Sequence, residues 1–213
     1  MLRIIGGEKK GQRLKMINDP KIRPMPAKLR EALFNIIQTK VIGATCLDGF
    51  AGSGAIGLEA LSRGAAKVVF IEEYSPAIRI IRQNVEKCGF QDRTRIIQEE
   101  FNRGVIRLAK EKKSFDLIFI DPPYELLKER NPLKVIKKRG ILKPNGLVIL
   151  RHFNKIVPDL RFFERFRLVR YGDDVISFFR HRHEEKKELN QGREREAEGV
   201  DPEKMRQESK EIN

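Results

Sequence analysis

The segment 119–125 has the sequence FIDPPYE, in which an apolar run ends at an acid that two prolines and a tyrosine follow. Proline fixes its own φ at about −65° and has no amide hydrogen, so neither proline can continue a helix or donate within a sheet. The Asp121 carboxylate and the Pro122 carbonyl can therefore accept both hydrogens of one exocyclic NH2 group. Pro123 stiffens the turn, and Tyr124 can stack on the base that carries this amine.

A fixed pair of acceptors suits the transfer of a methyl group to a nucleobase amine. The lone pair of such an amine is delocalised into the ring, and hydrogen bonds to its two protons favour a pyramidal nitrogen that can attack a sulfonium methyl group. Positive charge develops on the nitrogen, where preorganised acceptors stabilise it, and positioning supplies much of the remaining acceleration. Either Asp121 or solvent can take the surplus proton. A hydride-transfer enzyme has no use for this pair, and a rigid structural turn is the alternative.

A glycine-rich segment, LDGFAGSGAIGLEA at 47–60, contains the spacing GxGxxG. It follows an expected strand and opens an expected helix, where glycines let the backbone approach a ligand at the helix N-terminus. A tight strand-to-helix turn without a ligand is the alternative. The candidate cofactor-binding residues of this loop are Phe50, Ala51, Gly52, Ser53 and Gly54.

Acidic residues end the next two expected strands. Glu72, followed by Glu73, lies 20 residues after the first glycine of this spacing, where an acid can bind both hydroxyls of a ribose. Glu100 is a candidate for an adenine amino group and Phe101 for the face of the ring, but Glu99 can take that role, or both acids can be solvated. These features predict an adenosine-containing cofactor. NAD and S-adenosylmethionine both fit these features. The acceptor pair of Asp121 and Pro122 excludes hydride transfer and therefore favours S-adenosylmethionine.

The elements that must position these residues alternate along the chain. Continuously apolar runs such as VVFI and LIFI are typical of strands in a parallel sheet that helices cover on both faces. Two late strands without a helix between them indicate an antiparallel edge, so the expected fold class is α/β, doubly wound and Rossmann-like. Strands are expected at 44–50, 67–73, 93–99, 115–121, 146–152, 165–172 and 174–180, with helices at 54–64, 75–89, 101–110 and 125–140. Before them, a β-hairpin is expected from 2–7 and 11–17 and an amphipathic helix from 26–38.

Composition bounds the class of protein. The 213 residues contain 44 Lys and Arg against 30 Asp and Glu, a net charge of +14, which favours a nucleic-acid partner over a merely soluble basic surface. No apolar run suits a membrane helix or a signal peptide, so we expect a cytoplasmic protein. Cys46 and Cys88 are expected to be buried free thiols, and the three histidines to lie at the surface rather than on a metal.

Basic residues near the N-terminus flank the expected site in sequence and offer contacts to RNA phosphates, with ordinary solvated charges as the alternative. A non-catalytic RNA-binding protein would share this charge but would not need Glu72 or Asp121. A DNA adenine-N6 methyltransferase would share the turn at 121–124, which we call the acceptor turn, but such enzymes usually contain an additional target-recognition domain. The RNA-binding candidates are Arg3, Lys9, Lys10, Arg13, Lys15, Arg23, Lys28 and Arg30.

The motifs LDGFAGSGAIGLEALSRGA, VVFIEE and DPPY resemble those of class I S-adenosylmethionine-dependent methyltransferases acting on exocyclic amines. With LRIIGGEKKGQRL, IRPMPAKLREALFNII and YGDDVISFFR, residues 2–180 resemble the bacterial 16S rRNA guanine-N2 methyltransferase family known as RsmD. The resemblance implies a seven-stranded, mostly parallel sheet with an antiparallel last strand. It also implies S-adenosylmethionine as methyl donor, S-adenosylhomocysteine as product, and 16S rRNA as partner, either free or within the assembling small subunit.

The resemblance carries Asp48, Gly52, Gly54 and Glu72 to the cofactor and 121–124 to the target base. We expect a monomer without a metal or a membrane partner. The expected regions are an RNA-facing hairpin and helix at 1–40, a catalytic domain at 41–181, and a charged, disordered tail at 182–213 that lies outside the resemblance.

Three departures from the family pattern limit what the resemblance implies. The segment 25–27, MPA, replaces the usual Thr and Asp, so no hydroxyl contact is expected there. Gly49 stands where a bulky apolar residue is common, which changes packing. Arg151 stands where an acid often ends the fifth strand, so no acidic role is carried to that position.

Overall fold

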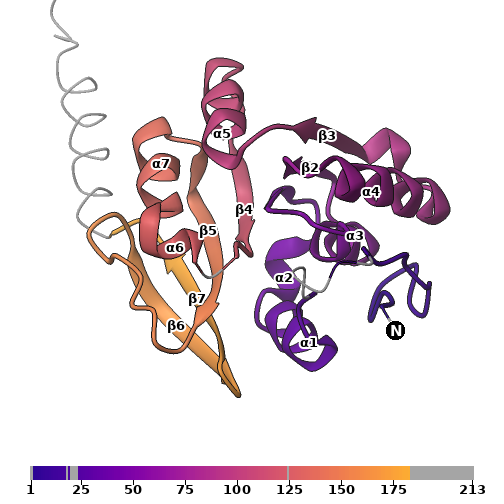
Figure 1. The fold of residues 1–213 in the computed structure, drawn as a ribbon, viewed down its shortest axis with the longest axis horizontal. Coiled ribbons are helices and arrows are strands. Elements are labelled where there is room, and N and C mark those ends of the chain that lie inside the picture. The colour runs from indigo at the N-terminus through magenta and orange to yellow at the C-terminus, as the bar shows by residue number, and fades with distance from the viewer. Residues whose placement is uncertain (1, 18, 20–23, 124, 183–213) are drawn as a thin grey trace, which may run out of the picture. The chain divides into compact units, whose positions relative to one another are not determined.

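The computed structural model describes residues 2–17, 19, 24–123 and 125–182. Two compact units divide the chain, Met1–Arg180 and His181–Asn213. The first unit contains the assigned helices and strands (Figure 1). The described residues before position 40 belong to the same unit as the sheet, because buried side chains such as Leu2, Ile4 and Leu14 join the core under α1, Ala27–Ile36.

A seven-stranded sheet has the order β3-β2-β1-β4-β5-β7-β6. β7 is antiparallel to both of its neighbours and the other paired strands are parallel, which confirms the predicted fold class and antiparallel edge. The strand order reverses direction between β1 and β4, and ligands of such sheets bind at this switch point. The strands are β1 Thr45–Gly49, β2 Lys67–Glu72, β3 Thr94–Gln98, β4 Phe115–Ile120, β5 Leu142–Phe153, β6 Glu164–Tyr171 and β7 Asp174–Arg180.

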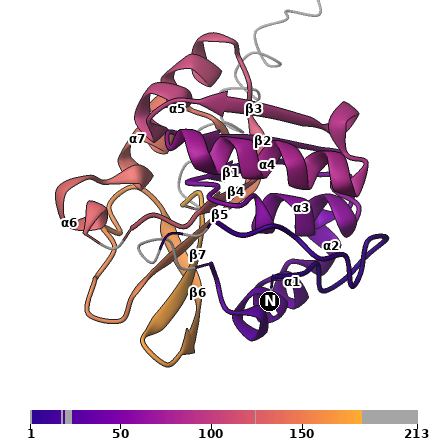
Figure 2. The ribbon, with the colours of Figure 1, turned by 45° about the vertical axis from the view of Figure 1, so that its right-hand side comes forward.

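Helices cover both faces of the sheet, and each face has its own apolar core. Successive residues of β4 alternate between the cores, because Phe119 packs with α1, α3 and α4 whereas Ile118 and Ile120 pack with α5 and α7. This double burial is the reason for the continuously apolar strands. Figure 2 shows α3 and α4 next to each other over the strands. The remaining helices are α2 Gln38–Val41, α3 Ala55–Ser62, α4 Ser75–Cys88, the 3-10 turn Gln91–Arg93, α5 Phe101–Lys110, α6 Leu126–Glu129 and α7 Pro132–Arg139.

Some local expectations need correction. The helix expected over 26–38 is α1 followed by the separate short α2, because the backbone at Ile37 leaves helical geometry. The expected hairpin has one isolated bridge, Arg3 with Arg13, rather than paired strands. His152 is 2% exposed, with Nε2 2.9 Å from Ser177 Oγ, so its expected surface position is wrong. Both cysteines are buried and free, as expected.

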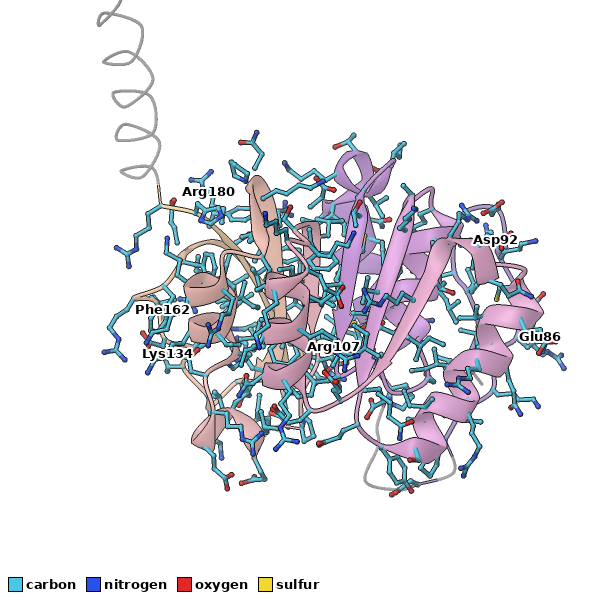
Figure 3. The ribbon with its side chains drawn as sticks, turned by 90° about the horizontal axis from the view of Figure 1, so that it is seen from above. Glu86, Asp92, Arg107, Lys134, Phe162 and Arg180 are labelled. Carbon is cyan, nitrogen blue, oxygen red and sulfur yellow. The ribbon has the colours of Figure 1, made fainter. Side chains whose placement is uncertain are left out.

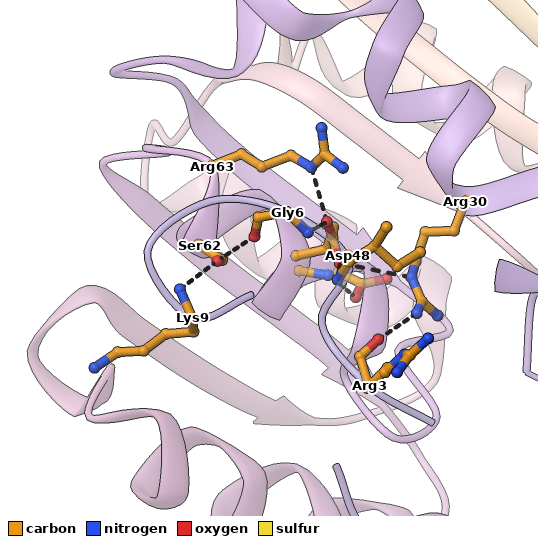
Figure 4. A network of polar contacts seen from close by, with 10 residues as sticks. Arg3, Gly6, Lys9, Arg30, Asp48, Ser62 and Arg63 are labelled. Atoms are coloured by element: carbon orange, nitrogen blue, oxygen red, sulfur yellow. Dashed lines mark hydrogen bonds and ion pairs between the residues drawn. The ribbon is translucent and has the colours of Figure 1, made fainter. Parts of the chain in front are cut away.

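Glu59 on α3 anchors the N-terminal segment to the sheet domain, within the polar network in which Figure 4 labels Gly6, Arg30 and Arg63. The amide nitrogens of Ile5 and Gly6 lie 2.7 and 2.8 Å from its two carboxylate oxygens. Arg63 Nε donates to Oε1 at 2.7 Å, and Arg30 Nε lies 3.8 Å from Oε2. Because Glu59 is fully buried and Arg30 is 1% exposed, this is a buried charge cluster on which chain segments far apart in sequence converge.

Asn84 on α4 provides a second attachment, which links the N-terminal segment to the glycine loop. Its Oδ1 accepts from Lys15 N at 2.7 Å, and its Nδ2 donates to the carbonyls of Lys15 and Ser53 at 3.0 Å each. Asn84 is fully buried, so these bonds take the place of hydrogen bonds to water.

Among the described helices, none is both long and apolar enough to cross a membrane.

Candidate active site

A cleft of about 910 Å³ lies where the carboxyl ends of β1, β2, β3 and β4 meet. Its described lining contains seven acidic residues and one basic residue, Arg151. The lining residues come from the segment before α1, the glycine loop, the strand ends, the acceptor turn with the start of α6, and the β6–β7 hairpin. They are Pro24, Pro26, Phe50, Gly52, Ile71, Glu72, Glu73, Tyr74, Glu99, Phe101, Asp121, Pro122, Pro123, Glu125, Leu126, Arg151, Phe153, Asp173 and Asp174.

The glycine loop turns sharply between β1 and α3. Gly52 and Gly54 have φ values of 54° and 77°, in the left-handed region that glycine tolerates. Phe50 adopts φ 65°, an uncommon value for a residue with a side chain, and such outliers often occur at ligand sites. A Cβ on Gly57 would lie 2.3 Å from Phe70 Cε1, so this glycine lets α3 pack closely on β2.

Asp48 is buried behind the glycine loop and is not among the described residues that line the cleft. Its side chain is 1% exposed, and Oδ2 accepts from the Gly57 amide at 2.8 Å. Burial raises the pKa of Asp48 well above its usual range, although the hydrogen bond from Gly57 opposes this effect. The structure therefore places Asp48 behind the first turn of α3, where it orients the glycine loop.

Glu72 reaches the cleft from the end of β2 and is held by two backbone amides. Its Oε2 accepts from Gly52 N at 2.8 Å, and its Oε1 accepts from Tyr74 N at 3.0 Å. An ionised carboxylate has about four acceptor positions, so both oxygens can accept further hydrogen bonds. Glu73 lines the same part of the cleft, which places two acids beside the glycine loop.

An aromatic wall follows these acids. The rings of Phe50 and Phe101 stack with centroids 4.7 Å apart, and both residues line the cleft. A Cβ on Gly49 would lie 2.4 Å from Phe101 Cε2, so the ring of Phe101 fills the space that a bulky residue at 49 would need. The sequence could not reveal that Phe101 fills the space beside Gly49, because these two positions meet only in the folded protein.

The two acids before and at the start of α5 have different surroundings. Glu99 lines the cleft and pairs with Arg107 at 2.5 Å. Glu100 accepts from Arg103 N at 3.1 Å as the N-cap of α5 and from Arg130 Nη1 at 2.8 Å. Of the three alternatives left open by the sequence, this arrangement favours Glu99 for a contact inside the cleft.

Asp121 directly follows β4 and lines the same cleft, with 16% of its side chain exposed. Burial raises the pKa of Asp121, and the neighbouring Arg151 guanidinium lowers it to a smaller extent. Pro122 and Pro123 continue the lining as expected, while Tyr124 lies outside the described residues. The acceptor turn and the glycine loop, which are far apart in sequence, thus share one cleft.

The basic candidates near the N-terminus separate by burial. Arg30 is 1% exposed and donates from Nη2 to the Arg3 carbonyl at 2.6 Å, so the expectation of an RNA contact at Arg30 is wrong. Lys9 is half-buried beside Phe90, and Arg23 lies outside the described residues. The side chains that remain exposed are those of Arg3, Lys10, Arg13, Lys15 and Lys28.

Comparison with known proteins places these features in one family. The model of a family described as conserved hypothetical protein 95 matches residues 2–180. The chain is 33% identical over 149 residues to the ribosomal RNA small subunit methyltransferase D of Haemophilus influenzae, covering 69% of this chain and 76% of that protein. The protein of the same name from Escherichia coli K12 is also 33% identical over 149 residues, covering 69% and 72%. The solved structure of a hypothetical protein from Thermus thermophilus aligns with a TM-score of 0.74 at 28% identity, covering 84% of this chain and 99% of that one.

Proposed function

The chain belongs to the family described as conserved hypothetical protein 95, the RsmD family of rRNA methyltransferases, and on this basis we propose that it methylates the exocyclic N2 amine of a guanine in 16S rRNA. The chain is thus an rRNA methyltransferase. The proposal concerns which rRNA it methylates, at which base and on which amine of that base. The observation that carries it is that the Asp121–Pro122 turn and the glycine loop line one cleft.

The cleft suits S-adenosylmethionine as the methyl donor. Glu72 and Glu73 offer acceptors for the ribose hydroxyls, and the Phe50–Phe101 stack offers an apolar wall for the adenine ring. The acidic lining favours a cationic ligand over a phosphate-bearing one. When bound, S-adenosylmethionine supplies an electrophilic methyl group, whose bond to sulfur breaks with both electrons remaining on sulfur.

The protein's own residues then act on the amine. The Asp121 carboxylate and the Pro122 carbonyl accept its two protons, which orients the lone pair and stabilises the positive charge that develops as the new carbon–nitrogen bond forms. The surplus proton leaves to Asp121 or to solvent. RNA phosphates are expected on the exposed basic side chains outside the acidic cleft, among them Arg3, Lys10 and Arg13.

The test is mass mapping of 16S rRNA from cells that lack the protein, followed by methylation of that RNA in vitro, both free and in small subunits. We expect one guanine to lack an N2 methyl group and the purified protein to restore it. Transfer to an adenine amine or to DNA, or the absence of any S-adenosylmethionine binding by calorimetry, would contradict the proposal.

Replacing Glu72 with alanine is expected to weaken S-adenosylmethionine binding by about 10- to 100-fold. The variant loses a charged acceptor for the ribose and also the bonds that hold Gly52 N and Tyr74 N. Isothermal titration calorimetry measures the change, and Glu86→Ala on the exposed side of α4 is the matched control. An unchanged Kd in Glu72→Ala would remove Glu72 from the cofactor site.

A further inference from the structure

Arg151 lies between two carboxylates at the substrate side of the cleft. Its Nη1 is 3.2 and 3.3 Å from the two Asp121 carboxylate oxygens, while Nε and Nη2 lie 3.0 and 2.9 Å from Asp174 Oδ1. Only 8% of the Arg151 side chain is exposed. The guanidinium therefore belongs to the interior of the site and not to its solvated rim.

The sheet brings these three residues together. Ile120 pairs with Leu150 across parallel strands, so Asp121 and Arg151 follow side by side where β4 ends. Arg151 pairs with Ile176 across the antiparallel β5–β7 ladder, which places Asp174, two residues earlier in β7, diagonally opposite on the same face. The backbone thus presents the guanidinium to Asp121 from one side and to Asp174 from the other.

The distances distinguish the two contacts. Arg151 makes two shorter contacts with Asp174, through Nε and Nη2, and this pairing fixes the plane of the guanidinium. Its contact with Asp121 is longer and uses a single nitrogen shared between both oxygens. Because a carboxylate has about four acceptor positions, Asp121 retains acceptors for an amine while Arg151 stays in place.

We propose that Arg151, anchored by Asp174, is a positioning residue for methyl transfer that keeps the Asp121 carboxylate ionised and correctly oriented to receive the target amine. This inference rests on the proposed function, because Asp121 is the acceptor that Arg151 serves. It assigns a role in the reaction to a basic residue at a position where the sequence had indicated only the loss of an acidic one.

The charges around Asp121 explain why a cation is needed there. Burial favours the neutral acid, and the nearby carboxylate of Asp174 on β7 favours it too. Two further acids are close by, because burial and Asp121 both raise the pKa of Asp48 on β1, and Glu125 lines the same cleft. A protonated Asp121 would convert one acceptor into a donor and would lose its attraction for the developing cation. Arg151 opposes the protonation of Asp121, and Asp174 balances the positive charge of Arg151. The two carboxylates and the guanidinium together therefore present a net negative charge to the amine.

The test compares Arg151→Met, which keeps bulk without charge, with Arg151→Lys, which keeps the charge. We expect Arg151→Met to lose about 10- to 100-fold in kcat at pH 7, with a KM for S-adenosylmethionine close to that of the wild type. Without Arg151 the Asp121 carboxylate ionises only at higher pH, so the acid limb of the kcat profile should move to higher pH and activity should return as pH rises. Arg151→Lys should bring the limb back toward the wild-type position.

A direct readout does not depend on turnover. Carbon-13 NMR of the Asp121 carboxyl should show it titrating at higher pH in Arg151→Met than in the wild type. An unmoved titration, or a loss of kcat that does not recover at any pH, would overturn the inference and leave Arg151 a structural residue.

If Arg151→Met does not fold, as judged by circular dichroism, the double variant Arg151→Met/Asp174→Leu removes both charges of the anchoring pair. The Asp121 titration should then move in the same direction but less far, because Asp174, like burial, itself raises the pKa of Asp121. A wild-type protein that does not methylate rRNA would contradict the proposed function alone, since the NMR titration still tests the role of Arg151.

Discussion

Replacing Asp121 with alanine is expected to lower the rate of methyl transfer by about two orders of magnitude or more, while S-adenosylmethionine affinity stays within a few-fold of wild type. The carboxylate is one of two preorganised acceptors for the amine, and its interaction strengthens as positive charge develops. The carboxylate oxygens of Glu72 are held by the amides of Gly52 and Tyr74 and not by Asp121, so the loss of Asp121 should spare the cofactor contacts.

Single-turnover kinetics with saturating rRNA and S-adenosylmethionine measure the chemical step, and calorimetry measures cofactor binding. Asp121→Asn adds a sharper comparison, because it keeps the shape and one carbonyl acceptor but removes the charge. Asp92→Ala, at an exposed position labelled in Figure 3, is the matched control for losing an aspartate and should retain wild-type rates. Near-normal turnover in Asp121→Ala would refute the role assigned to this acid.

Replacing Glu59 with alanine is expected to lower the free energy of unfolding by about 3–5 kcal/mol, the usual cost of removing one partner of a buried ion pair. The change leaves Arg30 and Arg63 without their counter-charge and the amides of Ile5 and Gly6 without their acceptor. Arg30 already has Nε and Nη1 buried without a hydrogen-bond partner among the described residues, so it depends on the nearby carboxylate for charge compensation.

Urea denaturation followed by circular dichroism measures this loss. Glu86→Ala is the control, because Glu86 projects from the exposed side of α4 (Figure 3) and should change the free energy of unfolding by less than about 0.5 kcal/mol. Glu59→Gln should fall between the two, since an amide keeps one acceptor but no charge. Equal stability of Glu59→Ala and Glu86→Ala would show that the buried cluster does not hold the N-terminal segment.

Local sequence determined the fold class and the position of the chemistry. Runs such as that of β4 are apolar on both faces, a pattern that predicts a covered parallel strand wherever it occurs. Residues at the carboxyl ends of such strands share one crevice by topology, so Glu72 and Asp121 were predictable as neighbours of one site. The proline pair predicted the stiff turn, because its backbone constraint acts within the turn itself.

Tertiary structure decided what each charged side chain does. Lys28 and Arg30 both lie in the first half of α1, yet Arg30 is buried against the N-terminal segment and Lys28 is exposed. The contact of Arg151 with Asp121 depends on the β4–β5 register and on a hairpin that returns Asp174 to the same face. Whether a charge is solvated, buried or paired is set by segments far apart in the chain, and local periodicity carries no record of those neighbours.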